Sequence, residues 1–330
     1  MSINVGPPDH DLSDLTDHPA DTSGIAYDVA VVGGGAAGLS AAVALARFAQ
    51  SVVVIDEGTP RNAAAGHVHN MLTRDGTSPT ELYRLGQAEV TRYGGHVVAG
   101  TVHSVHGSAG AFTLQLGDQT IAAHRIIVAA GSRDELPDVP GLAERWGTDV
   151  VHCGFCHGYE VRNQRIGVLA TGPMAIHQAM MFRLLSPSVT VLAHTAPPTS
   201  DQIEALTQRG ITIVPGVVAE VLSHNDHLTG VRLADGNLID LDALVVSSVV
   251  HARADFLAPL GLHPTDFSIN GHTVATRIET GPNGATDVPG VWVAGNTSEP
   301  MAQVVAAAAN GLTVAGAVIG DRLSTPPTQR

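Results

Sequence analysis

Two cysteines, Cys153 and Cys156, are the residues of this chain whose type and spacing point most directly to chemistry. They are the only cysteines among 330 residues, and His152 and His157 flank them. Two thiols at this spacing can form a small, reducible disulfide, and a helix start or a protonated histidine beside them lowers a thiol pKa. We therefore interpret the pair as a redox dithiol whose thiolate form the flanking histidines can stabilise.

Three other interpretations of the pair compete with this one. An inert buried pair is the first, and the surrounding sequence favours redox chemistry over it. A structural zinc site would need four ligands, and no second C-x-x-C or H-x-x-x-H follows, so no metal is assigned. The histidine after Cys156 completes C-x-x-C-H, the haem-attachment pattern, but that chemistry normally requires export and the sequence shows no signal peptide.

A glycine-rich turn near the start predicts a nucleotide site. A short apolar strand over 27–32 runs into G-x-G-x-x-G, and an alanine-rich helix follows over about 39–49. In this turn Gly33 allows the tight bend, Gly35 lets the backbone approach a pyrophosphate, and Gly38 packs the helix on the strand.

An acidic residue stands at the position that such a site requires. The second strand, 51–55, ends in Asp56, which can hydrogen-bond the ribose hydroxyls of a dinucleotide, with Glu57 as the adjacent alternative. The polar segment 58–72 that follows lacks an amphipathic period. It is either an ordinary surface loop or a loop that wraps the cofactor through Arg61 and Asn70.

The middle of the chain repeats the opening pattern. Strand-like segments at 96–98, 102–106, 111–116 and 126–130 end at Gly131, a further turn that would bring backbone close to the same cofactor. A proline-containing linker at 136–141 precedes the cysteine motif. A strand at 164–169, a turn at 170–175, a helix at 176–185 and a strand at 189–193 then repeat the βαβ unit.

The second copy lacks the residues that hold a nicotinamide nucleotide. Ala170 occupies the first glycine position, and His194 and Thr195 stand where an acid or arginines would contact the ribose. Our interpretation is that the fold is retained and the ligand site is lost. A divergent but working site is the alternative, so NAD(P)H is a doubtful cofactor.

These elements predict an α/β protein with two Rossmann-like, three-layer dinucleotide-binding domains. Further strands are predicted at 211–215, 217–222, 229–233 and 244–250, a strand at 288–294 runs into a polar turn, and the last helix opens after Pro300. The predicted organisation is a tail at 1–24, a discontinuous first domain at 25–137 and 256–330, and a central domain at 138–255 that carries the cysteines.

Composition narrows the classes of partner. The formal charge of −14 argues against binding to nucleic acid or an anionic membrane, because the cations that neutralise phosphates are too few. The apolar stretch 301–320 is long enough to suggest a membrane helix, but Gln303, Asn310 and three glycines favour a buried core helix. We expect a soluble, cytoplasmic protein.

Taken together, the motifs resemble those of the low-molecular-weight thioredoxin reductase family of flavoproteins, over about 25–323. Four features carry the resemblance in the family's order: the glycine turn, the C-x-x-C pair, the second βαβ unit at 166–193, and Ala294-Gly295-Asn296 with Gln303. The resemblance implies FAD in the first domain, which the C-terminal segment completes, and a homodimer.

The resemblance also assigns roles to single residues. Asp56 would bind the adenosine ribose, and Asn296, beside Gly295, would bind the flavin ribityl chain, although the family usually has aspartate there. Gln303 and Val304 would lie at a helix start facing the pyrimidine ring of the isoalloxazine. His157 stands where the reductases have an acidic proton donor for the dithiol, and histidine can do that work near neutral pH.

Within the family, the run from Cys153 to Glu160 and the missing arginines are most similar to the dithiol oxidases, which close the disulfides of natural products such as gliotoxin and holomycin. The expected function is an FAD-dependent oxidase of a small dithiol, with O2 as acceptor and hydrogen peroxide as product. An NAD(P)H-dependent thioredoxin or disulfide reductase is the first alternative. A non-catalytic flavin or nucleotide sensor with a dithiol switch is the second.

Overall fold

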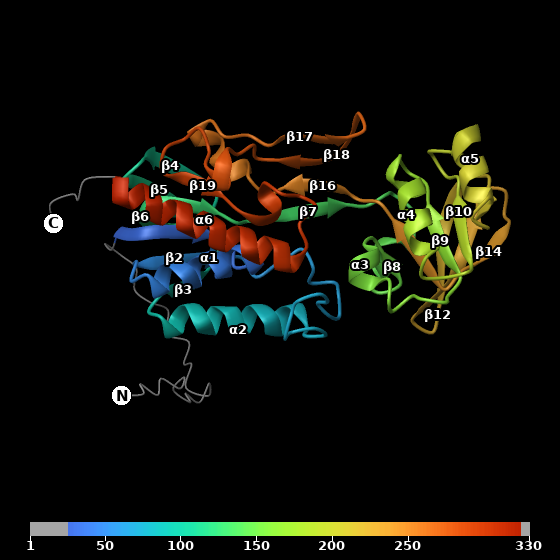
Figure 1. Cartoon of the computed structure of the whole chain (residues 1–330), viewed down its shortest axis with the longest axis horizontal. Helices are drawn as coiled ribbons and strands as arrows, with labels where there is room; N and C mark the ends of the chain where they lie inside the picture. Colours follow the sequence, from blue (N-terminus) through green and yellow to red (C-terminus); the bar gives the residue numbers. More distant parts are fainter. Residues whose placement is uncertain (1–25, 325–330) are drawn as a thin grey trace, which may run out of the picture.

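The computed structural model describes residues 26–324, so the expected tail at 1–24 lies outside the described residues. The described chain forms two units that lie side by side and are joined by two strands (Figure 1). The larger unit contains the first and the last described elements, and the smaller unit is formed by the middle of the chain.

The larger unit is built on a mixed sheet of order β3-β2-β1-β6-β5-β4, and β19 also pairs with β6. The pairs among β3, β2, β1, β6 and β19 are parallel, whereas β4–β5 and β5–β6 are antiparallel. The strands are β1 (Ala26–Val32), β2 (Val52–Asp56), β3 (His96–Ala99), β4 (Ser104–Ser108), β5 (Ala111–Leu116), β6 (Gln119–Val128) and β19 (Val291–Val293).

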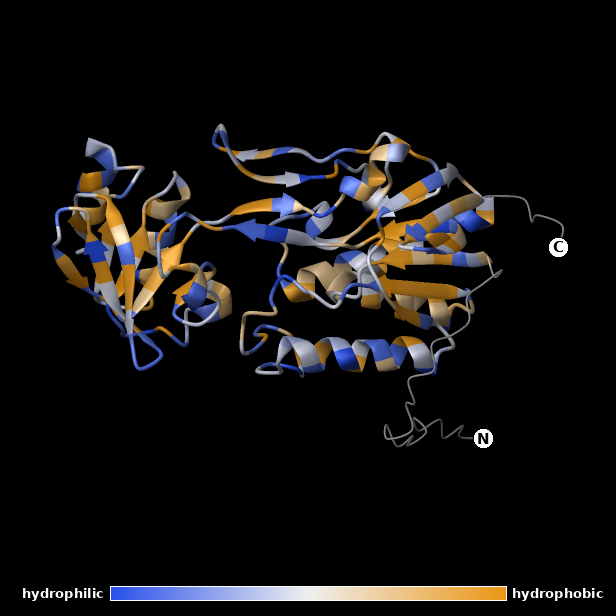
Figure 2. Cartoon of the chain, turned by 180° about the vertical axis from the view of Figure 1, so that it is seen from behind, coloured by the Kyte–Doolittle hydropathy of each residue, from blue (hydrophilic) through white to orange (hydrophobic). Residues whose placement is uncertain are grey.

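Both faces of this sheet are buried. Along β1, Val29 and Val31 belong to a core cluster shared with the helices, and Ala30 and Val32 belong to a second cluster on the opposite face. A strand covered on both faces needs a continuous apolar run, which β1 provides from Val29 to Val32. Figure 2 shows the apolar strands inside both units.

The helices of the larger unit are α1 (Ala36–Arg47), α2 (Pro79–Arg92) and α6 (Val304–Ser324).

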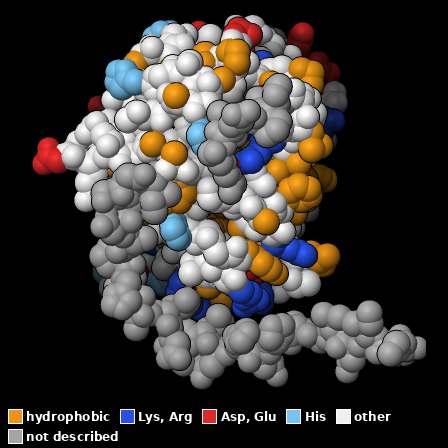
Figure 3. Space-filling view, turned by 90° about the vertical axis from the view of Figure 1, so that its left-hand side faces the viewer, with side chains coloured by type: hydrophobic (Ala, Val, Ile, Leu, Met, Phe, Trp, Pro, Cys, Tyr) orange, Lys and Arg blue, Asp and Glu red, His pale blue; other side chains and the backbone are white. Residues whose placement is uncertain are grey.

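Helix α6 is the one described helix that is long and apolar enough to cross a membrane by length and composition. One of its faces packs on α1, because a Cβ atom on Gly311 would lie only 2.0 Å from the carbonyl oxygen of Ala37. The opposite face is open, with Val305 43% and Leu312 57% exposed. The expectation of a buried core helix therefore holds for one face only. At the end of the larger unit away from the smaller one, apolar side chains lie dispersed among polar and basic ones (Figure 3).

The two units are joined where β7 (Ser132–Glu135) and β16 (Val249–Ala252) pair as antiparallel strands. Both strands belong to a sheet of order β17-β18-β16-β7, completed by the hairpin of β17 (Thr265–Ile269) and β18 (His272–Arg277). The chain therefore leaves the larger unit after β7 and re-enters it at β16, seven residues before the expected return at residue 256.

The smaller unit is a second βαβ-based body. Its parallel sheet has the order β11-β10-β9-β15-β8, and a three-stranded antiparallel sheet, β12-β13-β14, packs beside it. The predicted α/β architecture with two Rossmann-like units is confirmed. The strands are β8 (Val150–Val151), β9 (Ile166–Leu169), β10 (Val189–Leu192), β11 (Thr212–Val214), β12 (Val218–His224), β13 (His227–Leu233), β14 (Leu238–Asp240) and β15 (Ala243–Val246), and the helices are α3 (Gly154–His157), α4 (Met174–Phe182) and α5 (Ser200–Thr207).

The single strand predicted at 244–250 is wrong. The segment forms β15 and β16, which belong to different sheets and are separated by Ser247 and Ser248. The Ser247 hydroxyl donates to Gln178 and the Ser248 hydroxyl to Asp134, so side-chain hydrogen bonds hold the chain where it crosses between the units. An apolar run interrupted by two serines gives no periodic signal for such a crossing.

Two further segments differ from expectation. The predicted linker at 136–141 is packed, because Val139 is buried and the Pro140 carbonyl accepts a hydrogen bond from the Val221 N–H at 2.8 Å. Helix α2 was not predicted, although its start carries the usual signals: Ser78 caps the Glu81 N–H and Pro79 occupies the first turn.

Candidate functional site

The two cysteines form a disulfide at the start of α3, with their Cα atoms 5.2 Å apart. The residue after Cys153 packs on α4, because a Cβ atom on Gly154 would lie 2.7 Å from the Sδ atom of Met181 and would require that side chain to move. The disulfide turn is therefore seated directly against α4.

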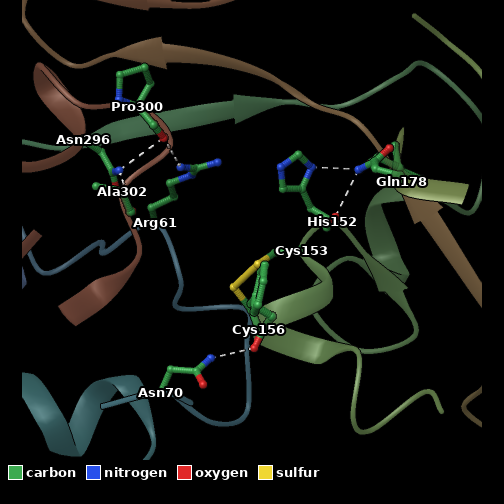
Figure 4. Close-up of a disulfide and its surroundings, with 11 residues drawn as sticks. Arg61, Asn70, His152, Cys153, Cys156, Gln178, Asn296, Pro300 and Ala302 are labelled. Carbon is green, nitrogen blue, oxygen red and sulfur yellow. Dashed lines mark hydrogen bonds between the residues drawn. A yellow bond between two sulfur atoms is a disulfide. The ribbon is translucent and has the colours of Figure 1, made fainter. Parts of the chain in front are cut away.

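The disulfide faces a cavity of about 1370 Å³ that lies between the two units. The smaller unit lines it with the cysteine motif and α4, and the larger unit lines it with the glycine turn, the loop after β2 and the start of α6. In Figure 4 the disulfide lies between the loop that carries Asn70 and the segment from Asn296 to Ala302. Every site residue predicted from the sequence lines this cavity, apart from Gly38 and Asn70.

Asn70 contacts the cysteine motif instead of the cavity. Its backbone has a φ of +60°, and its Nδ2 atom donates to the carbonyl oxygen of Phe155 at 2.8 Å (Figure 4). The preceding residue, His69, places Nδ1 3.3 Å from Asp75 and Nε2 3.5 Å from Glu160, which follows the motif. This loop of the larger unit therefore contacts α3 and the residue Glu160 that follows it.

His152 has its imidazole ring held beside Cys153 by a hydrogen bond to the backbone. Its Nδ1 atom donates to the Val246 carbonyl at 3.0 Å, which leaves Nε2 to accept a proton. Burial lowers the pKa of His152 below its ordinary value, despite that hydrogen bond. Its own carbonyl accepts from Nε2 of the buried Gln178 at 3.1 Å, so the backbone entering the motif is held as well.

His157 follows Cys156, and its ring forms no hydrogen bond with the described residues. Both ring nitrogens are buried, and neither has a hydrogen-bond partner among residues 26–324. Burial lowers the pKa of His157, His69 and His152 act in the same direction, and Glu160 opposes them. A neutral imidazole with unpaired nitrogens can act as a base toward the dithiol once the ring shifts enough to expose one of them.

The glycine turn has the geometry that a bound dinucleotide requires. Gly33 has a φ of +107°, and a Cβ atom there would lie 2.3 Å from the Ala129 carbonyl oxygen. A Cβ atom on Gly38 would lie 1.9 Å from the Gly33 oxygen, whereas Gly35 opens into free space. Asp56 accepts from the Gly34 N–H at 2.9 Å and lines the cavity. The open backbone at Gly35, beside a carboxylate at the strand end, fits the pyrophosphate and ribose of FAD.

Two predicted cofactor residues are engaged with the protein itself. Glu57 forms an ion pair with Arg253. Arg61 holds Asp134 with two hydrogen bonds of 2.8 and 2.7 Å and also reaches the Pro300 carbonyl at 3.3 Å (Figure 4). Burial works to raise the pKa of Asp134, but the hydrogen bonds and charge of Arg61 outweigh it, so that pKa is lowered.

The C-terminal part of the site is ordered by amide side chains. Nδ2 of Asn296 lies 3.0 to 3.2 Å from the carbonyl oxygens of Glu299, Pro300 and Ala302 (Figure 4), and Asn310 accepts from the Gly295 N–H at 2.8 Å. An aspartate at 296 could not donate these bonds. Gly131, from the end of β6, is joined to the same region by Thr297, and Gln303 and Val304 line the cavity where α6 begins.

The second βαβ unit uses its nucleotide positions internally. Nδ1 of His194 accepts from the Val218 N–H at 3.0 Å, and burial lowers the pKa of His194. The N–H groups of Thr195 and Ala196 both bond the Ala170 carbonyl, at 3.2 and 3.0 Å. The His194 side chain, at the position that would contact a ribose, is therefore already hydrogen-bonded to the backbone.

Sequence reasoning missed the residues that hold the cysteine motif and the crossing between the units. Gln178, Asp134 and Ser248 act through contacts spanning 26 to 114 positions along the chain. The one signal available was Gln178 itself, which with the neighbouring His177 is one of two polar residues in a helix that is otherwise apolar (Met174–Phe182).

Comparison with known proteins gives consistent matches along the chain. The model of the pyridine nucleotide-disulphide oxidoreductase family matches residues 27–311. The chain is 32% identical over 320 residues to thioredoxin reductase tcpT of Claviceps purpurea, covering 90% of this chain and 94% of the relative. It is 31% identical over 312 residues to thioredoxin reductase sirT of Leptosphaeria maculans, covering 88% and 93%.

Solved structures match over the same range. The crystal structure of HlmI is 38% identical with a TM-score of 0.83, covering 91% of this chain and 93% of that one. An oxidoreductase from Agrobacterium tumefaciens is 33% identical with a TM-score of 0.85, covering 92% and 100%.

Proposed function

The chain belongs to the pyridine nucleotide-disulphide oxidoreductase family, as its thioredoxin reductase-like motifs predict, and we propose that it is an FAD-dependent oxidase of small dithiols. The reaction converts one dithiol and one O2 into a cyclic disulfide and one H2O2. One observation carries this proposal: the Cys153–Cys156 disulfide and the glycine turn that fits FAD open into the same cavity.

The first half of the reaction needs only this chain's residues. A substrate thiol loses its proton to a neutral histidine, His157 or His152, and its thiolate attacks Sγ of Cys153. The Cys153–Cys156 bond breaks, Cys156 leaves as thiolate, and a mixed disulfide forms. The second substrate thiolate attacks the substrate sulfur of that bond, the cyclic disulfide leaves, and Cys153 becomes a thiolate. The choice of Cys153 as the attacked sulfur follows the family resemblance.

The second half restores the enzyme disulfide. Bound FAD would supply a two-electron acceptor for the reduced cysteine pair and a route for those electrons to O2. Gly33, Gly35 and Asp56 would hold its pyrophosphate and adenosine ribose. Asn296 makes its side-chain hydrogen bonds through Nδ2, so its Oδ1 atom would be available to accept from the ribityl chain.

An oxidase is favoured over an NAD(P)H-dependent reductase by the second βαβ unit. A nicotinamide nucleotide needs an acid or arginines at the strand end, and His194 stands there with its ring bound to the backbone. The contacts of His69 and Asn70 with α3 and Glu160 also favour a small substrate, because a protein disulfide could reach the cysteines only by displacing this loop.

The remaining properties follow by analogy with the family. We expect a cytoplasmic homodimer whose partners are a small dithiol and O2, without nucleic acid or membrane. Sedimentation of the FAD-loaded protein measures the dimer directly.

Steady-state stoichiometry tests the proposed function. With dithiothreitol as substrate, we expect one O2 consumed and one H2O2 formed per disulfide produced, and a rate about three orders of magnitude lower with Cys153→Ser. Oxidation of NADPH that depends on an added disulfide, without oxygen uptake from dithiol, would identify a reductase and overturn the proposal.

A further inference from the structure

Helix α4 presents three side chains to the cavity beside the disulfide. Met174, His177 and Met181 recur at intervals of three and four residues, which places them on one helix face, and all three line the cavity. Ile176 and Met180, from the other side of the helix, pack against the core of the smaller unit. Neither Met174 nor Met181 belongs to a core cluster of the described residues.

This face is fixed relative to the disulfide. The Sδ atom of Met181 lies against Gly154, inside the cysteine motif. Gln178 lies on the same face, between His177 and Met181, and holds the His152 carbonyl with one end of its amide and the Ser247 hydroxyl with the other. Met181 therefore lies next to the cysteine motif, and Met174 and His177 continue the same helix face along the cavity.

This face of α4 carries no side chain with a permanent charge, so it suits an apolar ligand better than a charged one. From Met174 to Phe182 the helix carries no lysine, arginine, aspartate or glutamate. Among the cavity cations, Arg61 is neutralised by Asp134 and Arg253 by Glu57, while Arg133 lies on β7, in the other unit. A carboxylate desolvated against this face would meet no charged partner on α4 and only the His177 imidazole as a side-chain donor, whereas the two thioethers adapt to irregular apolar shapes.

We propose that this face of α4, in the unit that would otherwise hold a nucleotide, is the substrate-selecting wall, and that it favours an uncharged, largely apolar dithiol over an anionic one. The inference rests on the proposed function. Met174 and Met181 contact the substrate body while its thiols exchange with the Cys153–Cys156 disulfide, and His177 lines the more exposed part of the same wall.

A matched pair of probes tests the wall. Dihydrolipoamide and dihydrolipoate carry the same dithiol and differ in an amide against a carboxylate. Each is mixed anaerobically with the FAD-loaded enzyme, the reaction is quenched with an alkylating agent, and reduced Cys153 and Cys156 are counted by mass. This readout reports disulfide exchange and is independent of oxygen turnover. We expect the amide to reduce the wild-type disulfide at least about tenfold faster.

Lysine substitutions supply the decisive comparison. Met174→Lys should bring the two rates close together, and His177→Lys, at an exposed position on the same face, should do the same if the first variant fails to fold. Leu184→Lys is the control, because Leu184 follows α4, is 88% exposed and does not line the cavity. Its ratio should equal that of the wild type.

The outcomes separate the wall from the reaction. Equal rates with both probes in the wild type, or an unchanged ratio in both Met174→Lys and His177→Lys, would overturn the wall and leave the oxidase in place. Selective disulfide reduction without oxygen uptake would support the wall and overturn the oxidase. Failure of both probes to reduce the disulfide would overturn both.

Discussion

The amide of Asn70 donates a hydrogen bond to the carbonyl oxygen of Phe155, 2.8 Å away, and so joins a loop of the larger unit to the residue between Gly154 and Cys156. We predict that Asn70→Gly slows turnover about fivefold, the equivalent of ~1 kcal/mol for a neutral hydrogen bond. Glycine tolerates the φ of +60°, so the variant removes the bond without backbone strain. Steady-state rates with dithiothreitol measure the effect.

Asn163 provides the matched control. It has a φ of +61° and lies outside the cavity. Asn163→Gly should keep the wild-type rate, and equal losses in the two variants would show that the bond to Phe155 does not orient the motif.

The two cysteines should be distinguishable by what they trap. Cys156→Ser leaves Cys153 without its resolving partner, so treatment with a linear aromatic disulfide should give a stable adduct on Cys153, seen by intact mass. Both single variants should lose about three orders of magnitude of dithiol oxidation, because the pair acts as a unit. Full turnover in either variant would contradict the proposed exchange.

The rate of disulfide reduction should fall at acid pH, because His157 has to be neutral to take a proton. Burial lowers its pKa, so the neutral base is fully available above about pH 6.5 and is lost as the pH falls through the lowered pKa. His157→Asn should slow anaerobic disulfide reduction about 100-fold at pH 7.5, and the ratio of wild-type to variant rates should shrink as the pH is lowered. A ratio that stays constant with pH would show that His157 takes no proton.

The same residue links stability to pH. Between the lowered pKa and the ordinary value the unfolded chain binds more protons than the folded one, so the stabilisation from neutral His157 is present above about pH 6.5 and is lost below it. Urea unfolding at pH 7.5 and 5.5 should show a smaller pH effect in His157→Asn than in the wild type. Identical pH effects would contradict the burial of a neutral imidazole.

The bond between Arg61 and Asp134 should matter more for stability than the exposed pair of Glu57 with Arg253. The carboxylate of Asp134 is only 9% exposed, so Asp134→Asn leaves a partly buried arginine without its counter-charge and should cost about 2 kcal/mol. Glu57→Gln, at a half-exposed pair, should cost roughly 0.5 kcal/mol. Denaturant unfolding compares the two, and equal costs would contradict the assignment.

The features that depend on residues close together in the sequence could be predicted from it. The strand and glycine turn up to Gly38 and the acid at Asp56 follow local rules, and the structure places them as expected. The split of 244–250 between two sheets and the hold of Gln178 on His152 could not be predicted, because they depend on contacts between distant segments. Asn70 and Arg61 were assigned to the cofactor from their loop alone, and their protein partners emerged only in three dimensions.

The central claim is that a dithiol, and not a nicotinamide, feeds electrons into the flavin. Anaerobic FAD-loaded protein is divided between two cuvettes, one receiving NADPH and the other dihydrolipoamide, and the visible flavin absorbance is followed. We predict bleaching only with the dithiol, reversed on admitting air with formation of hydrogen peroxide. Prompt bleaching by NADPH would contradict the account and make the protein a reductase.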